Sequence, residues 1–140
     1  MGINSLDRFI KAQELAYPIA LRGIKNGKKR SHWMWYMFPQ LRRLGRSSMA
    51  HAYGIEGLDE AKAYLEHPVL SGRIYELCGE LLKHKDKTAL EIFGDIDEMK
   101  LKSSMTLFAL TSEDYTIFDE VLEHFFGGEM DEVTVKLING

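Results

Sequence analysis

The sequence contains a single cysteine, Cys78, and its N-terminus has no apolar stretch. One cysteine cannot form an internal disulfide, and the seven methionines beside it show no adaptation to an oxidising compartment. The residues from Met1 to Arg8 turn polar at once and lack the apolar region of a secretory signal. We therefore expect a cytoplasmic protein.

Long apolar runs and metal-binding patterns are also missing. The longest apolar run, Trp33 to Phe38, is far shorter than the roughly 20 residues that cross a bilayer, so we expect no membrane partner. The five histidines are scattered, which predicts no metal site, and no motif predicts a bound cofactor. Glycine-rich phosphate loops, H-E-x-x-H and G-x-S-x-G are likewise not found.

No segment alternates apolar and β-branched residues with polar ones, so the sequence predicts no sheet. Apolar residues recur instead at helical spacing, as in Leu70, Ile74, Leu77 and Leu81. No linker or repeat divides the chain. We expect residues 1–140 to form one compact, all-α, multihelical domain of about seven to eight short helices.

Capping residues and prolines predict the helix boundaries. Asn4 is a candidate N-cap for a first helix, which should end at Tyr17 because the residue before Pro18 is pushed out of the α region. A second helix from Pro18 should end near Asn26–Gly27. Further helices are expected from Gly45–Ser48 to Tyr53 and from Gly57 to His67, and the longest helix should begin at Pro68. The capping boxes Thr88/Glu91 and Asp95/Glu98 should each begin another helix. The last two helices are expected through Phe118–Phe126 and after Asp131.

Charge is distributed unevenly along the chain, whose net charge is −3. No acidic residue lies between Leu15 and Ile55, whereas this stretch carries eight basic ones. The rest of the chain holds 10 basic against 21 acidic residues, a balance of −11. The basic stretch therefore either meets an external anion or docks on the protein's own acidic helices. The acidic remainder, together with the lack of a recognition helix, argues against nucleic acid as a partner.

Three segments contain residue types suited to ligand binding. The segment Lys28–Gln40 combines consecutive cations, both tryptophans and a glutamine, and such a mixture suits a nucleotide-like ligand. Gly45–Ser48 precedes a helix start, where backbone N–H groups can hold phosphate. Lys100–Ser104 places a lysine within one helical turn of two serines. Each segment also has a purely structural interpretation, as packed core, as a helix cap or as close helix packing.

The same segments carry a resemblance to a known family. The run Lys29–Gln40, with Leu44–Ser47, His67–Leu70, Ile92–Gly94 and Ser103–Phe108, closely resembles the "domain of unknown function 1810" family. The resemblance covers nearly the whole chain and implies a compact bacterial helical domain without an established activity. This family often has arginine before the Ser-Ser-Met, where this chain has Lys102 and so lacks a bidentate fork.

A more distant similarity is to helical proteins of NAD and ADP-ribose metabolism. We therefore predict a pocket for an anionic, nucleotide-like small molecule, such as ADP-ribose or an NAD-related compound, where the three segments converge. His32 is the one candidate acid or base. The alternative is a protein-interaction module whose basic stretch binds an acidic protein partner. The candidate ligand-binding residues are Lys29, Arg30, Ser31, His32, Trp33, Trp35, Gln40, Arg46, Ser47, Lys102 and Ser103.

Overall fold

Helices form almost all the regular structure of residues 6–140, which are the residues that this computed structural model describes. No strand occurs within that range, and one isolated parallel bridge joins Leu41 to Ile55. The prediction of an all-α fold is confirmed. In chain order the elements are α1 (Asp7–Lys25), α2 (Met34–Met37), the 3₁₀ turn η2 (Arg42–Leu44), α3 (Ser48–Ala52), α4 (Leu58–Glu66), α5 (Pro68–Leu82), α6 (Ala89–Phe93), α7 (Asp95–Leu110), α8 (Ile117–Phe126) and α9 (Glu132–Asn139).

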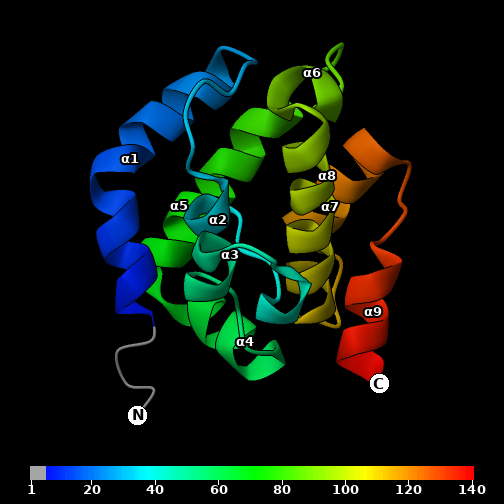
Figure 1. Ribbon diagram of the computed structural model, residues 1–140. Helices are drawn as coiled ribbons and strands as arrows, with labels where there is room; N and C mark the ends of the chain where they lie inside the picture. Colours follow the sequence, from blue (N-terminus) through cyan, green and yellow to red (C-terminus); the bar gives the residue numbers. More distant parts are fainter. Residues whose placement is uncertain (1–5) are drawn as a thin grey trace.

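The helices pack around α5 and α7. Figure 1 shows α1 along one side of the molecule and α9 along the other, with α5, α7 and α8 between them. The chain from α2 to α3 crosses the front of this arrangement, and α4 closes one end. Within residues 6–140 no helix is long and apolar enough to cross a membrane.

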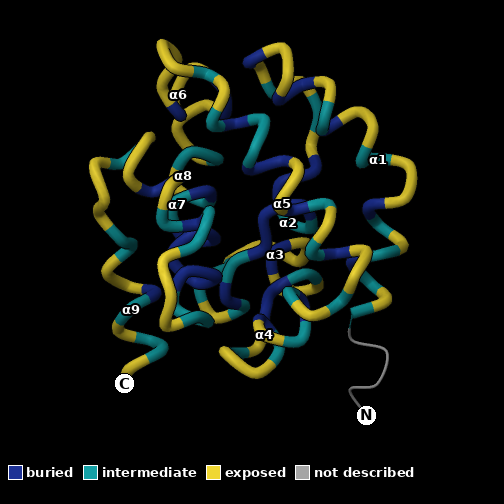
Figure 2. The backbone as a smooth tube through the Cα atoms, turned by 180° about the vertical axis from the view of Figure 1, so that it is seen from behind, coloured by how far each residue is buried: buried dark blue, intermediate teal, exposed yellow. Residues whose placement is uncertain are grey.

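The centre of the core lies on α7, which is buried on every side from Leu101 to Ala109 except at Lys102. A helix with apolar or small residues on every face is a core helix. Helix α7 accordingly contacts α4, α6, α8 and α9. Figure 2 shows that buried residues concentrate in α5 and α7, whereas exposed ones lie on the outer turns of α1 and α9.

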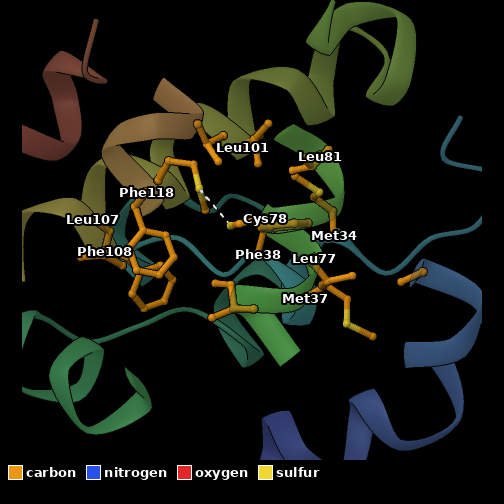
Figure 3. Close-up of a cluster of buried hydrophobic side chains, with 14 of the residues drawn as sticks. Met34, Met37, Phe38, Leu77, Cys78, Leu81, Leu101, Leu107, Phe108 and Phe118 are labelled. Atoms are coloured by element: carbon orange, nitrogen blue, oxygen red, sulfur yellow. Dashed lines mark hydrogen bonds between the residues drawn. The ribbon is translucent and has the colours of Figure 1, made fainter. Parts of the chain in front are cut away.

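The short helix α2 completes this core from the opposite side. Met34, Met37 and Phe38 extend toward Leu77 and Leu81 of α5 (Figure 3). The thiol of Cys78 lies in the same cluster, 3.8 Å from a methionine sulfur of α7, and its burial raises its pKa. Met34 and Met37 are buried, whereas Trp35 and Tyr36 between them are half-buried.

The predicted break at Tyr17–Pro18 is wrong, because α1 runs without interruption to Lys25. Pro18 has no backbone N–H, so the carbonyl of Glu14 lacks its helical hydrogen-bond donor. Both residues lie on the exposed face of α1, where water can donate to that carbonyl. Tyr17 is held in the helix by α5, since its hydroxyl donates to the Glu76 carboxylate and the Arg73 guanidinium lies 5.5 Å from its ring centroid. The continuous α1, and not the helix from Pro68, is consequently the longest.

One predicted capping box is also wrong, and one candidate cap lies outside the described residues. Asp95 is the first helical residue of α7, and Gly94 occupies the N-cap position with φ +87°, a conformation that favours glycine. The Asp95 carboxylate accepts only from the adjacent N–H of Ile96, at 2.9 Å. Asn4 falls outside residues 6–140.

The other predicted caps are confirmed. Thr88 and Glu91 form a reciprocal capping box, and Ser47 and Asp131 each accept from a backbone N–H three residues ahead. A further box, Thr116 with Asp119, begins α8, which ends at the left-handed Gly127. Side-chain caps depend on residues three apart, so they are readable from sequence wherever the helix start is placed correctly.

A buried glutamine links α1 to three other helices. The Gln13 amide nitrogen donates to the Tyr36 carbonyl of α2 at 2.6 Å and lies 3.1 Å from the Tyr64 hydroxyl of α4. Its amide oxygen accepts from the Arg73 guanidinium of α5 at 3.2 Å. Burial raises the pKa of the Tyr64 hydroxyl. The inward face of α1 is therefore fixed by directional hydrogen bonds as well as by apolar packing.

We expect Gln13→Leu to lower the free energy of unfolding by about 2 to 4 kcal/mol, because one buried and two partly buried polar groups on three helices lose their partner. The measurement is urea denaturation, in which the midpoint should fall at an unchanged slope. Glu14→Leu, at the adjacent exposed position, is the control and should change stability by less than about 0.5 kcal/mol. Equal effects of the two substitutions would contradict this role of Gln13.

We expect Pro18→Ala to raise the free energy of unfolding by about 1 to 2 kcal/mol. Alanine restores a helical hydrogen bond and has a far better helix propensity than proline. The larger conformational entropy of the unfolded chain with alanine offsets part of this stabilisation. Thermal unfolding followed by circular dichroism measures the effect, with the exposed Leu15→Ala as a near-neutral control. A lower melting temperature for Pro18→Ala would contradict the account of a tolerated but costly proline.

Candidate functional site

Parts of two of the three predicted segments, Lys28–Gln40 and Lys100–Ser104, meet in a small pocket between α2, α3 and the first half of α7, whereas no residue of Gly45–Ser48 lines it. Its volume of about 10 Å³ is space for a single water molecule, so it is too small to be a ligand-sized cavity. Trp35 and Gln40, both predicted site residues, line it. The full lining consists of Met34, Trp35, Phe38, Gln40, Ala50, Tyr53, Gly54 and Lys100.

The two tryptophans have different environments. Trp33 is 1% exposed and packs edge-on against Phe93, with the ring centroids 6.4 Å apart, so its ring belongs to the core. Its indole N–H has no hydrogen-bond partner among the described residues. Trp35 is only half-buried and contributes to the pocket. Of the two rings, Trp35 is therefore the one with surface available for stacking on a ligand.

A cluster of three charged side chains, Lys29, Asp97 and Lys100, lies beside the tryptophans. The Lys29 ammonium is 2.8 Å from one Asp97 carboxylate oxygen, and the Lys100 ammonium is 3.9 Å from the other. Lys29 also lies 5.2 Å from the ring centroid of Trp33, and Lys100 lies 5.3 Å from that of Trp35. One carboxylate thus serves two cations, and the lysine–aspartate cluster retains one positive charge.

Backbone contacts position this cluster. The N–H of Lys29 donates to the carbonyl of Ile92 at 2.8 Å, which fixes the loop after α1 to the end of α6. Gly27, with φ +74°, makes the turn that leads from α1 into this loop. Asp97 and Lys100 are three residues apart on α7, so they share a helix face. The cluster is therefore assembled from segments that are distant in sequence.

The remaining predicted residues on the loops are mostly exposed. Arg30 and Arg46 are exposed and form no ion pair with any described residue. Ser47 accepts from the N–H of Ala50 at 3.1 Å, so its hydroxyl caps α3, and Ser31 is half-buried. His32 is exposed and its imidazole has no partner within residues 6–140. Nothing in this arrangement prepares His32 as a general base.

Lys102 faces away from the pocket, and Ser103 does not line it. The Lys102 ammonium is 3.1 Å from the Glu129 carboxylate and lies 5.9 Å from the ring of Phe126, on the α8–α9 side. Ser103 and its neighbour Ser104 are buried within the core, and the Ser104 hydroxyl has no partner among the described residues. Neither serine has an adjacent base that could activate it.

One of the two interpretations of the basic stretch, docking on the protein's own acidic residues, is confirmed in part, and contact with an external anion stays a prediction. Lys29 is paired with α7, and the Arg42 guanidinium donates to the Glu56 carboxylate, so part of the stretch docks on the protein's own acids. Sequence reasoning missed Asp97 and the role of Lys100. Their spacing of three residues next to a predicted helix start was the available signal.

A larger groove lies elsewhere, between α4 and α9. It has a volume of about 750 Å³, and its apolar residues come from four distant parts of the chain, so no local pattern predicts it. Two of its carboxylates are neutralised, since Glu60 is bonded to Arg8 and Glu56 to Arg42. This α4–α9 groove is lined by Leu6, Leu41, Arg43, Glu56, Gly57, Leu58, Asp59, Glu60, Ala63, Leu137 and Ile138. Within residues 6–140 no group of acidic, histidine or cysteine side chains could hold a metal ion.

Comparisons with known proteins agree with this description. The chain is similar to the conserved hypothetical protein Rv1873 from Mycobacterium tuberculosis, a crystal structure with 43% sequence identity and a TM-score of 0.94. The match covers 96% of each chain. No curated protein matches. A family model described as "Protein of unknown function (DUF1810)" matches residues 3–138. The chain therefore belongs to the DUF1810 family.

Proposed function

We propose that the protein binds a small anionic ligand of the nucleotide type, such as ADP-ribose or an NAD-related compound. The proposed site is the surface where the His32–Gln40 segment meets Lys100, together with the Gly45–Ser48 segment that follows in sequence. The observation that carries this proposal is the lysine–aspartate cluster, which holds an uncompensated positive charge beside the half-buried ring of Trp35. A cation next to an aromatic surface is the combination that phosphate and a nucleobase require.

The electrostatic support comes from partial burial. Lys100 is 24% exposed, so its charge is less well screened than that of a surface lysine but is still accessible to a ligand. Arg30 and Arg46 lie on segments that flank the pocket residues in sequence, and neither forms an ion pair with a described residue. Together with the Lys100 ammonium, these guanidinium groups would attract phosphate oxygens.

The proposal is also supported by the apolar surface of Trp35 and Tyr53, which line the small pocket together with Gln40. In the free protein the Lys100 ammonium covers the Trp35 ring. A nucleobase would take that place on the ring, while the ammonium turns toward the phosphates. The Gln40 amide supplies a donor and an acceptor for the base edge. Because the pocket holds one water, binding requires these partly exposed side chains to rotate.

The α4–α9 groove favours a second candidate, the protein-interaction module. It is lined by large aliphatic side chains and is much larger than the Trp35 pocket, as expected for a surface that receives side chains of a partner. Under this candidate the lysine–aspartate cluster only fastens the loop after α1 to α7. Nucleotide-type ligands would then leave the melting temperature unchanged at millimolar concentration, whereas a ligand at 100 times its dissociation constant adds about 2.7 kcal/mol.

Sulfate at a few millimolar should raise the melting temperature more than chloride at equal ionic strength, because a bound dianion relieves the repulsion among the cations. Arg30→Gln and Arg46→Gln should each reduce that difference while the fold is retained. Arg43→Gln, an exposed and unpaired arginine of the same stretch that lines the α4–α9 groove, is the matched control. Equal responses of the unsubstituted protein to sulfate and chloride would rule out the anion site.

Trp35→Ala should weaken the binding of ADP-ribose by on the order of tenfold or more, as the loss of one stacked base implies. Its effect on stability should be well below that of Trp33→Ala, which removes a buried ring and should cost about 3 to 5 kcal/mol. Isothermal titration calorimetry measures the affinity and urea denaturation the stability. Tyr115→Ala, at an exposed ring on the α7–α8 loop, serves as control and should leave the affinity unchanged.

A further inference from the structure

We propose that the α4–α9 groove of one copy of this chain receives the outer face of α1 from a second copy. That face carries Leu15 and Ile19, two large aliphatic side chains one helical turn apart. They are 89% and 49% exposed, and Leu15 is the most exposed large apolar side chain of residues 6–140. This inference rests on the second candidate function, protein interaction at the groove, and does not depend on the anion site.

The outer face of α1 cannot fill the groove of its own molecule. The buried Gln13 and Ala20 fix the side of α1 that faces the core, so Leu15 and Ile19 lie on the outer side. Helix α1 runs without interruption along one side of the molecule, whereas α4 closes one end (Figure 1). Figure 2 shows the outer turns of α1 as exposed. A contact between this face and the groove therefore joins two copies.

The apolar surface of the groove matches this face. The volume of about 750 Å³ exceeds that of two aliphatic side chains, so Leu15 and Ile19 can enter together. Burial of such side chains against aliphatic groups is favourable roughly in proportion to the apolar area removed from water. The aliphatic residues that line the groove are Leu6, Leu41, Leu58, Ala63, Leu137 and Ile138.

Pro18 gives the outer face of α1 a hydrogen-bonding capacity that the groove can satisfy. Because proline has no N–H, the Glu14 carbonyl lacks its helical donor, and the Glu14 carboxylate is exposed and forms no ion pair with a described residue. Arg43, which lines the groove, is likewise exposed and unpaired among these residues. A guanidinium has five N–H donors, so Arg43 of one copy can donate to both acceptors of Glu14 in the other.

The remaining charges of the two surfaces are also complementary. Lys11 lies one turn before Leu15 on the outer face of α1, and Arg22 lies two turns after it. Both are exposed, and neither forms an ion pair with a described residue. Asp59 is the exposed acid of the groove that has no ion pair within residues 6–140. The helix thus offers cations to the acid of the groove and an acid to its cation.

The contact joins two different surfaces, because each copy holds one outer face and one groove. A single helix face makes a small interface, which predicts weak association with a dissociation constant of roughly 0.1 mM. The protein is then monomeric at the micromolar concentrations that suit unfolding experiments.

The test is sedimentation equilibrium of the full chain between about 10 µM and 0.5 mM, a range that brackets this dissociation constant. Leu15→Glu places a charge on the outer face, and Leu58→Glu places one in the groove. Each should weaken association by roughly tenfold or more, because a carboxylate without a partner is costly to bury. Both variants should fold, since Leu15 is exposed and an acid in the first turn of α4 is favourable.

An equimolar mixture of these two variants provides a second measurement. Leu58→Glu retains an intact outer face and Leu15→Glu retains an intact groove, so the mixture should form one-to-one dimers with about the affinity of the unsubstituted protein. Val133→Glu is the matched control and should leave association unchanged, because Val133 is 53% exposed in the first turn of α9 and does not line the groove.

Charge reversal tests the polar part of the contact. Arg43→Glu should weaken association by roughly fivefold through repulsion of Glu14, and the double substitution Glu14→Arg with Arg43→Glu should restore it. Arg43→Glu also reports on the groove if Leu58→Glu does not fold.

The outcomes separate this inference from the proposed functions. Unsubstituted protein that stays monomeric at about 0.5 mM, or a mixture of the two variants that does not associate, would overturn the inference. Association that the groove variants weaken but Leu15→Glu leaves unchanged would overturn the role of α1 and retain the groove as an interaction surface. Association that no variant weakens would overturn both. The response to sulfate, measured on the monomer, decides on the anion site separately.

Discussion

The hydrogen bonds of Gln13 fix the position of α1 relative to α2, α4 and α5, and much of the remaining structure depends on that position. Apolar packing alone allows helices to slide or rotate with little change in buried area. An amide has two hydrogen-bonding ends at a fixed separation, so its partners must approach from defined directions. Because Gln13 is buried, water cannot replace a partner that moves away, and the network selects one arrangement of four helices.

The candidate site is a consequence of this arrangement. The loop that carries Lys29 begins where α1 ends, and it reaches α6 and α7 only because α1 lies along α5. Trp33 then enters the core between Phe38 and Phe93, which leaves Trp35 at the surface. The alternation between a buried and a half-buried tryptophan therefore results from the way in which α2 is anchored, through its Tyr36 carbonyl, to Gln13.

The sequence predicted what is local and missed what depends on distant contacts. The all-α class and the caps at Ser47, Thr88 and Asp131 follow from residues a few positions apart. The break at Pro18 was mispredicted because Tyr17 is held by α5, a contact between residues far apart in sequence. The convergence of Trp35, Gln40 and Lys100 was predicted at the level of segments. The direction of Lys102, which points toward α9 and not toward the pocket, was not predicted. It depends on the rotation of α7, which helices later in the chain help to set.

The structure shows which cations of the basic stretch are paired with acidic side chains. Pairing within the molecule neutralises Arg42 directly and Lys29 through a carboxylate that is shared with Lys100. Had each cation of the basic stretch found its own acid, that stretch would be explained by structure alone. Instead Arg30 and Arg46 have no partner within residues 6–140, and one aspartate serves two lysines. The Lys29, Asp97 and Lys100 side chains therefore leave one positive charge in excess where α7 meets the loop after α1, beside the half-buried ring of Trp35.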